Sequence, residues 1–109
     1  MKLNENMYYL RLMHQYSISH LAKLVGYSPN TLANWERGDI SPNADAVEKL
    51  CEIYEISPNQ IFGWEKCEDL ESFLAERRQL IEDLNDLKKQ KASIEKRIKA
   101  YTDRFSRLT

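Results

Sequence analysis

The chain has 109 residues, with 16 Lys and Arg against 17 Asp and Glu, which gives a formal net charge of −1. This length fits one small domain with an appendage and leaves little room for a second full domain. A hydrophobic fraction of 42% excludes a wholly disordered chain, and no apolar run is long enough to span a membrane. With no visible signal peptide and only two cysteines, Cys51 and Cys67, the sequence predicts a cytoplasmic protein without a disulfide framework.

Residues that would support catalysis or metal binding are sparse. The three glycines form no phosphate-binding loop, and the two histidines, His14 and His20, match no metal-ligand spacing with either cysteine. No local signature supports a Ser/His or Cys/His nucleophile pair. We therefore expect no enzyme, no metal, no cofactor and no small-molecule ligand, and we expect Cys51 to lie in a core.

Composition changes near residue 66. All prolines, glycines and tryptophans lie before it, and the rest of the chain is rich in charged residues, Leu and Ile. Helix breakers therefore punctuate only the first part. This predicts a head of several elements over residues 1–66 and one long helix over residues 67–109. The predicted fold class is all-α, since no stretch alternates polar and apolar residues for long enough to form a strand.

Five helices are predicted in the head. Apolar residues at helical spacing place the first near residues 5–15. The second follows an N-cap at Ser17 and ends at Gly26, and the third runs from Pro29 to about Arg37. Val47, Leu50, Cys51 and Tyr54 mark the fourth helix, and Ile61 and Phe62 mark a short fifth.

The three prolines occur in identical Ser-Pro-Asn triplets that begin at Ser28, Ser41 and Ser57. Serine is a favoured N-cap, and proline at the first helical position loses only an N–H that has no partner there. In the middle triplet Asn43 is the better N-cap, because an aspartate then enters the first turn beside the positive helix end. Helix starts are therefore predicted near residues 29, 44 and 58.

Residues 17–38 combine two short helices and a turn that contains glycine, which is the arrangement of a helix-turn-helix motif. The stretch from Tyr16 to Ser28, and the residues NWERG from Asn34 to Gly38, resemble the Cro and lambda-repressor (XRE-type) family of phage and bacterial regulators. The resemblance covers about residues 4–64 and leaves out the C-terminal helix. It implies a five-helix head, double-stranded DNA as partner, and regulation of transcription, most often repression.

Base reading is assigned to the outward face of the third helix, since Leu32 and Trp35 face inward. Asparagine can pair with adenine through two hydrogen bonds, and alanine or a proline ring can contact a thymine methyl group. The candidate base-reading residues are Pro29, Asn30, Ala33 and Asn34. The resemblance makes the two asparagines the strongest of these candidates.

Contacts to DNA phosphates would come from polar side chains and from backbone N–H groups at the helix starts. The candidates are Ser17, Ser19, Tyr27, Ser28, Thr31 and Arg37, with Arg37 as the cationic group beside the groove. The resemblance also implies an ion pair between Arg11 and Glu36, which we interpret as structural.

Two positions depart from the family pattern. Ile18 replaces the polar residue that usually opens the second helix, and Asp39 stands where many relatives have a basic residue. Residues 1–66 carry six Lys and Arg against eight Asp and Glu, which gives −2 and predicts weak nonspecific DNA binding. These features favour an alternative, a helical protein-interaction module whose head no longer binds DNA. Asn30 and Asn34 oppose it.

The C-terminal helix has the pattern of a coiled coil. From residue 70 onward, ten of the twelve a and d positions of six heptads are apolar or aromatic, and the exceptions are Arg77 and Lys91. A second copy of the chain is the simplest partner, so we predict a homodimer through residues 70–109. The predicted interface residues are Leu70, Phe73, Leu80, Leu84, Leu87, Ile94, Ile98, Tyr101, Phe105 and Leu108.

Charge is segregated along this helix. Residues 67–86 carry two basic and seven acidic groups, and residues 87–109 carry eight basic and two acidic groups. The helix dipole does not explain this gradient, because its effect fades within a turn of each end. An antiparallel pair does, with Asp69 facing Arg104 and Glu76 facing Arg97. A parallel pair would instead set two heads at half-sites about 34 Å apart. We favour the antiparallel pair.

Overall fold

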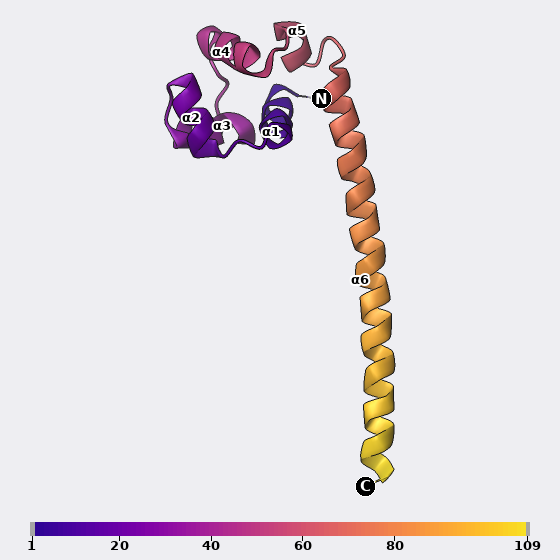
Figure 1. The fold of residues 1–109 in the computed structure, drawn as a ribbon. Coiled ribbons are helices and arrows are strands. Elements are labelled where there is room, and N and C mark those ends of the chain that lie inside the picture. The colour runs from indigo at the N-terminus through magenta and orange to yellow at the C-terminus, as the bar shows by residue number, and fades with distance from the viewer. Residues whose placement is uncertain (1, 109) are drawn as a thin grey trace. The chain divides into compact units, whose positions relative to one another are not determined.

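The computed structural model describes the backbone of residues 2–108 and the side chains of residues 2–106. This part of the chain contains helices and no strand, so the prediction of an all-α fold is confirmed. It divides into two compact units between Leu74 and Ala75. The helices, shown in Figure 1, are α1 (Leu3–Met13), α2 (Ile18–Val25), α3 (Pro29–Arg37), α4 (Ala44–Tyr54), α5 (Pro58–Ile61) and α6 (Glu68–Leu108).

The helix starts that the Ser-Pro-Asn triplets predict are confirmed. The side-chain oxygens of Ser28, Asn43 and Ser57 each accept a hydrogen bond from the backbone N–H three residues later, at 3.1, 2.8 and 3.1 Å. At α5 the contact is reciprocal, because the Gln60 side chain accepts from the Ser57 N–H at 2.9 Å. These caps pair N–H groups that a helix start leaves without a partner.

The predicted ends of α2 and α3 are also confirmed. Gly26 and Gly38 have φ angles of +79° and +82°, in the left-handed region that other residues rarely adopt. At Gly38 space is short as well, since an added Cβ would lie 3.2 Å from the side-chain amide of Asn4. Each helix of the motif therefore ends at a glycine that ordinary residues would not replace without strain.

The core of the N-terminal unit (residues 2–74) lies among α1 to α5. Helix α3 packs against α1 and α2, α4 packs against α2 and α5, and α1 packs against α5. Leu32, Trp35 and Cys51, which were predicted to face inward, are buried in it. The side chains with no measurable exposure are Leu10, Val25, Leu32, Ala46, Leu50 and Ile61.

The first turns of α6 belong to the same core. Cys67 and Leu70 are 9% and 5% exposed, and Phe73 and Leu74 pack half-buried beside them. The heptad pattern begins at Leu70, but at this end its apolar residues contact the chain's own helices. The compact unit thus extends past residue 66, where composition placed the domain boundary.

From Ala75 onward, α6 is a helix whose apolar side chains face solvent. We call its seven exposed a and d residues the apolar stripe: Leu80, Leu84, Leu87, Ile94, Ile98, Tyr101 and Phe105. The side chain of Leu108 lies outside the described residues, as does Thr109. Within the described residues, no helix combines the length and the apolar character needed to cross a membrane.

One buried polar atom of the core has no partner. The hydroxyl group of Tyr54 accepts and donates no hydrogen bond among the described residues. Replacing Tyr54 by Phe should therefore raise the free energy of unfolding of the N-terminal unit by about 1 kcal/mol at pH 7, as measured by urea denaturation. The control is Tyr27→Phe, which removes a hydroxyl 3.1 Å from the amide nitrogen of Asn43 and should not stabilise.

The same substitution should change the response to alkaline pH. Burial, with a further contribution from the charge of Glu36, raises the pKa of Tyr54 above that of an exposed tyrosine. The folded chain therefore favours the protonated tyrosine more strongly than the unfolded chain does. The stability that comes from this preference is complete below the unfolded-state pKa of about 10, and is lost as the pH rises through the raised folded-state pKa. The Tyr54→Phe variant should lack this loss. Equal stabilities of variant and native chain at pH 7 and pH 11 would contradict both expectations.

Candidate nucleic-acid interface

Helices α2 and α3 pack against each other and are joined by the short turn at Gly26, Tyr27 and Ser28. The Tyr27 ring meets the buried Trp35 ring edge to face, with centroids 4.9 Å apart. Its hydroxyl also accepts a hydrogen bond from Asn43, the N-cap of α4. The turn is therefore held from both sides, which fixes the angle between the two helices.

The four predicted base-reading residues share one face of α3. Pro29 and Asn30 are exposed, and Ala33 and Asn34 are half-buried. The positions lie one and four residues apart, so they fall on the same side of the helix, away from the buried Leu32 and Trp35. A helix held by its buried side with small polar and apolar groups outward has the shape that major-groove readout requires.

The structure joins Asn34 and Arg37 in a way that sequence analysis missed. A guanidinium nitrogen of Arg37 donates to the side-chain oxygen of Asn34, and its Nε donates to Asp39 at 3.0 Å. A guanidinium has five N–H donors and an amide oxygen has two lone pairs, so Arg37 and Asn34 can each contact DNA while these hydrogen bonds remain. Both partners of the ion pair are more than half exposed, so breaking it would also cost little.

The predicted phosphate-contacting serines are N-caps or neighbours of one. Ser17 accepts from the His20 N–H at 3.1 Å, and Ser28 caps α3 while lying 2.8 Å from the Thr31 hydroxyl. Accepting one bond leaves a hydroxyl able to donate its own proton to a phosphate oxygen. Ser17, Ser19 and Ser28 are exposed. They lie at the starts of α2 and α3, where backbone N–H groups favour anions.

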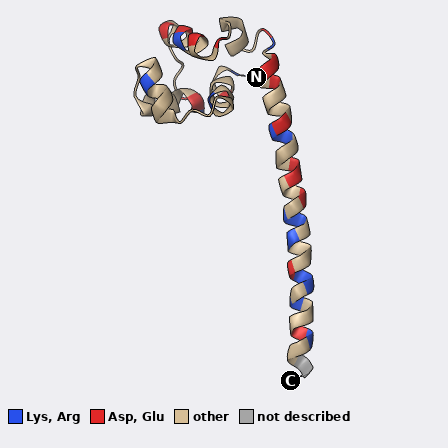
Figure 2. Ribbon diagram, in the orientation of Figure 1, with Lys and Arg blue, Asp and Glu red and all other residues tan. Residues whose placement is uncertain are grey.

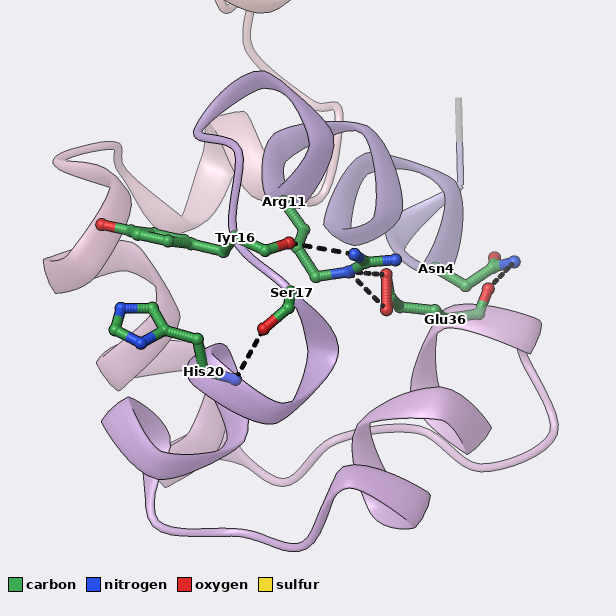
Figure 3. A network of polar contacts seen from close by, with 6 residues as sticks. All are labelled: Asn4, Arg11, Tyr16, Ser17, His20 and Glu36. Carbon is green, nitrogen blue, oxygen red and sulfur yellow. Dashed lines mark hydrogen bonds and ion pairs between the residues drawn. The ribbon is translucent and has the colours of Figure 1, made fainter.

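A largely buried ion pair joins α1 to the end of α3 (Figure 3). Arg11 Nε donates to both carboxylate oxygens of Glu36, at 2.7 and 3.0 Å, and a second guanidinium nitrogen donates to the Tyr16 carbonyl at 3.0 Å. The two side chains are only 13% and 7% exposed. Asn4 also donates to the Glu36 carbonyl. The ion pair implied by the family resemblance is confirmed. It links the last turn of α3 to α1.

Cationic groups near α2 and α3 are few. Lys23 and Arg37 are exposed in the last turns of the two helices. Lys49 makes a hydrogen bond within the fold, because its ammonium group donates to the Val25 carbonyl at the end of α2, at 3.3 Å. The sequence pattern gave no sign of this contact, because the two residues belong to different helices. The described cations near the two helices are therefore isolated side chains and do not form a broad basic surface.

This geometry defines a helix-turn-helix protein with a recognition helix that is open to solvent. The sequence model of the helix-turn-helix family matches residues 7–61, more than half of the chain. The chain therefore belongs to the helix-turn-helix family of the XRE type, a family of DNA-binding regulators. Searches for similar curated proteins and for similar solved structures found no match.

Proposed function

We propose that this protein is a sequence-specific repressor of transcription that binds double-stranded DNA as a homodimer. The observation that carries the proposal is the outward face of α3, where Asn30 and Asn34 stand clear of the core on a helix held by caps at both ends. Repression, as opposed to activation, rests on analogy with the family. The N-terminal helices would bind DNA, and α6 would bring two copies together.

The apolar stripe supports the homodimer. Each of its seven side chains is at least 50% exposed, from Leu84 at 50% to Phe105 at 67%. A row of this length on one face of a helix is unfavourable in water and is typical of a coiled-coil interface. A second copy of α6 offers a matching row.

A second candidate function is a protein-interaction module that does not bind DNA. The contact between Arg37 and Asp39 favours it, because this contact engages one of the few cations near α3. The excess of acidic residues over residues 1–66 favours it as well. Selection of binding sites from random duplex DNA separates the two candidates, since only the regulator enriches a sequence.

On the selected site, replacing Asn30 or Asn34 by Ala should cost about 1–3 kcal/mol of binding free energy and relax the preference at one base pair. Replacing Arg37 by Ala should weaken binding to all sequences and reduce the salt dependence by about one counterion. Fluorescence anisotropy at several salt concentrations measures both effects.

Asn59→Ala, at an exposed asparagine of α5, is the matched control and should bind like the native chain. If neither α3 asparagine alters sequence preference, the assignment of base reading to them is wrong. If no duplex is enriched at all, the interaction module replaces the regulator as the proposed function.

A further inference from the structure

The surface of α6 that is free to pair is shorter than the heptad pattern. Leu70 is 5% exposed, and Phe73 is half-buried against the core of the N-terminal unit. These two a and d positions are already covered by the chain's own helices. The apolar a and d side chains that face solvent begin with Leu80 and continue to Phe105. Any partner helix must therefore match the apolar stripe and not the full repeat from residue 70.

We propose that a second copy of the chain covers the apolar stripe in antiparallel orientation, with Leu87 opposite the partner's Ile98. This proposal rests on the homodimer proposed above and specifies its orientation and register. The facing pairs then run from Leu80 with the partner's Phe105 to Lys91 with the partner's Ile94. All seven residues of the stripe are used, and none faces Leu70 or Phe73.

Burial of lysine decides the orientation. In a parallel pair Lys91 would face its own copy at an a position, and two ammonium groups would meet in the interface. In the antiparallel pair it lies beside the partner's Ile94, and its stem can cover apolar surface while the ammonium group reaches solvent. Lys91 is 3.8 Å from Glu95 on the same helix, which favours such an outward course.

Charge complementarity supports the register. Figure 2 shows acidic residues concentrated toward the start of α6 and basic residues toward its end. In this register the flanking g positions bring Asp83 beside the partner's Arg104, and the e positions bring Lys88 beside the partner's Glu95. Twofold symmetry makes each pair occur twice, so four attractive pairs flank the stripe.

Two other antiparallel registers fit less well. A shift of one heptad, which pairs the full repeat from Leu70 to Leu108, sets Lys88 opposite the partner's Lys88 and leaves Phe105 facing the partner's Phe73. A shift of two heptads, in which Glu76 faces the partner's Arg97, sets Tyr101 opposite the partner's Leu70. Leu70 has almost no surface left to offer. The contacts within the N-terminal unit therefore select the register.

Cysteine cross-linking of the full-length chain tests the pairing. Single variants Leu87→Cys and Ile98→Cys are mixed, allowed to exchange subunits and oxidised, and disulfide-linked dimers are counted by mass. We expect a cross-link in the mixture and none in either variant alone, because each cysteine lies roughly 16 Å from its own copy. The native chain, whose cysteines are buried, is the blank.

Other outcomes are equally specific. Cross-links within each single variant would show a parallel coil, and a cross-link of Leu87→Cys with Leu84→Cys would show the register shifted by two heptads, in which Glu76 faces the partner's Arg97. Either result overturns the proposal and keeps the homodimer. A chain that sediments as a monomer at micromolar concentration overturns the homodimer itself, together with this proposal.

Charge reversal provides a second measurement with exposed residues, where folding is not at risk. Lys88→Glu should weaken the dimer roughly tenfold by sedimentation equilibrium, and adding Glu95→Lys should restore it. Lys89→Glu, one residue along at an outer f position, is the matched control and should have little effect. Failure of Glu95→Lys to restore the dimer overturns the register, since a parallel coil would pair Lys88 with Asp83 instead.

Discussion

A chain that ends after Leu74 should fold as a monomer and bind the selected DNA site about 10²–10⁴-fold more weakly than the full chain. It keeps the complete core, Cys67 and Leu70 included. It loses the apolar stripe, and with it the gain in effective concentration that tethering gives to a second half-site contact. Circular dichroism, sedimentation and fluorescence anisotropy measure fold, mass and affinity.

The position of the truncation matters. Ending the chain after Trp64 instead removes the buried side chains of Cys67 and Leu70 and should lower the free energy of unfolding, by about 2–5 kcal/mol for the loss of Leu70 alone. A truncated chain that binds DNA as tightly as the full chain would show that dimerisation through α6 is not needed for binding.

Replacing Glu36 by Gln should destabilise the N-terminal unit by about 3–5 kcal/mol. The substitution leaves the Arg11 guanidinium almost buried with no opposing charge. For a unit of this size such a loss is a large fraction of the total stability. Urea denaturation of the chain that ends after Leu74 measures the effect without a contribution from the dimer.

Two further variants show whether the effect comes from the ion pair. Glu48→Gln, at an exposed position of α4, is the matched control and should cost little. Replacing Arg11 and Glu36 together by Met should cost less than the sum of the single replacements, because no charge is then left alone. A loss below about 1 kcal/mol for Glu36→Gln would mean that the Arg11–Glu36 pair contributes no more to stability than an exposed ion pair does.

The starts of α2 to α5 were predictable from sequence because their causes are local, whereas α1, predicted near residues 5–15, begins at Leu3 with no side-chain cap. Caps at Ser28, Asn43 and Ser57 involve groups three residues apart, and Gly26 and Gly38 end helices through their own backbone angles. Such signals lie within a few residues of the boundary that they set, so a single sequence contains them in full.

Contacts between distant segments were not predictable in this way. An apolar heptad position such as Leu70 has the same pattern whether it faces a partner or the chain's own core, and only the fold shows that it faces the core. The link from Lys49 to the end of α2 also joins separate helices. The Arg11–Glu36 pair was expected from the family resemblance alone, since nothing in its spacing of 25 residues indicates contact.

The candidate site lies between these cases. The outward positions of Pro29, Asn30 and Asn34 follow from helical periodicity once the buried side of α3 is known. Helical periodicity does not predict how Arg37 divides its donors between Asn34 and Asp39, because these side chains lie close together on an exposed surface. Sequence therefore predicted which residues of α3 face outward, but not which of their side chains form hydrogen bonds with one another.

The engagement of Arg37 by Asp39 bears on how a regulator would be distributed in a cell. A genome offers about 10⁶–10⁹ competing sites, so occupancy of one operator depends on the ratio of specific to nonspecific affinity. Arg37 has further N–H groups that can contact a phosphate of any sequence, but the adjacent Asp39 carboxylate offsets part of the attraction between its charge and bulk DNA. Few molecules would then be sequestered on bulk DNA, and a small number of copies would suffice to keep a single operator occupied.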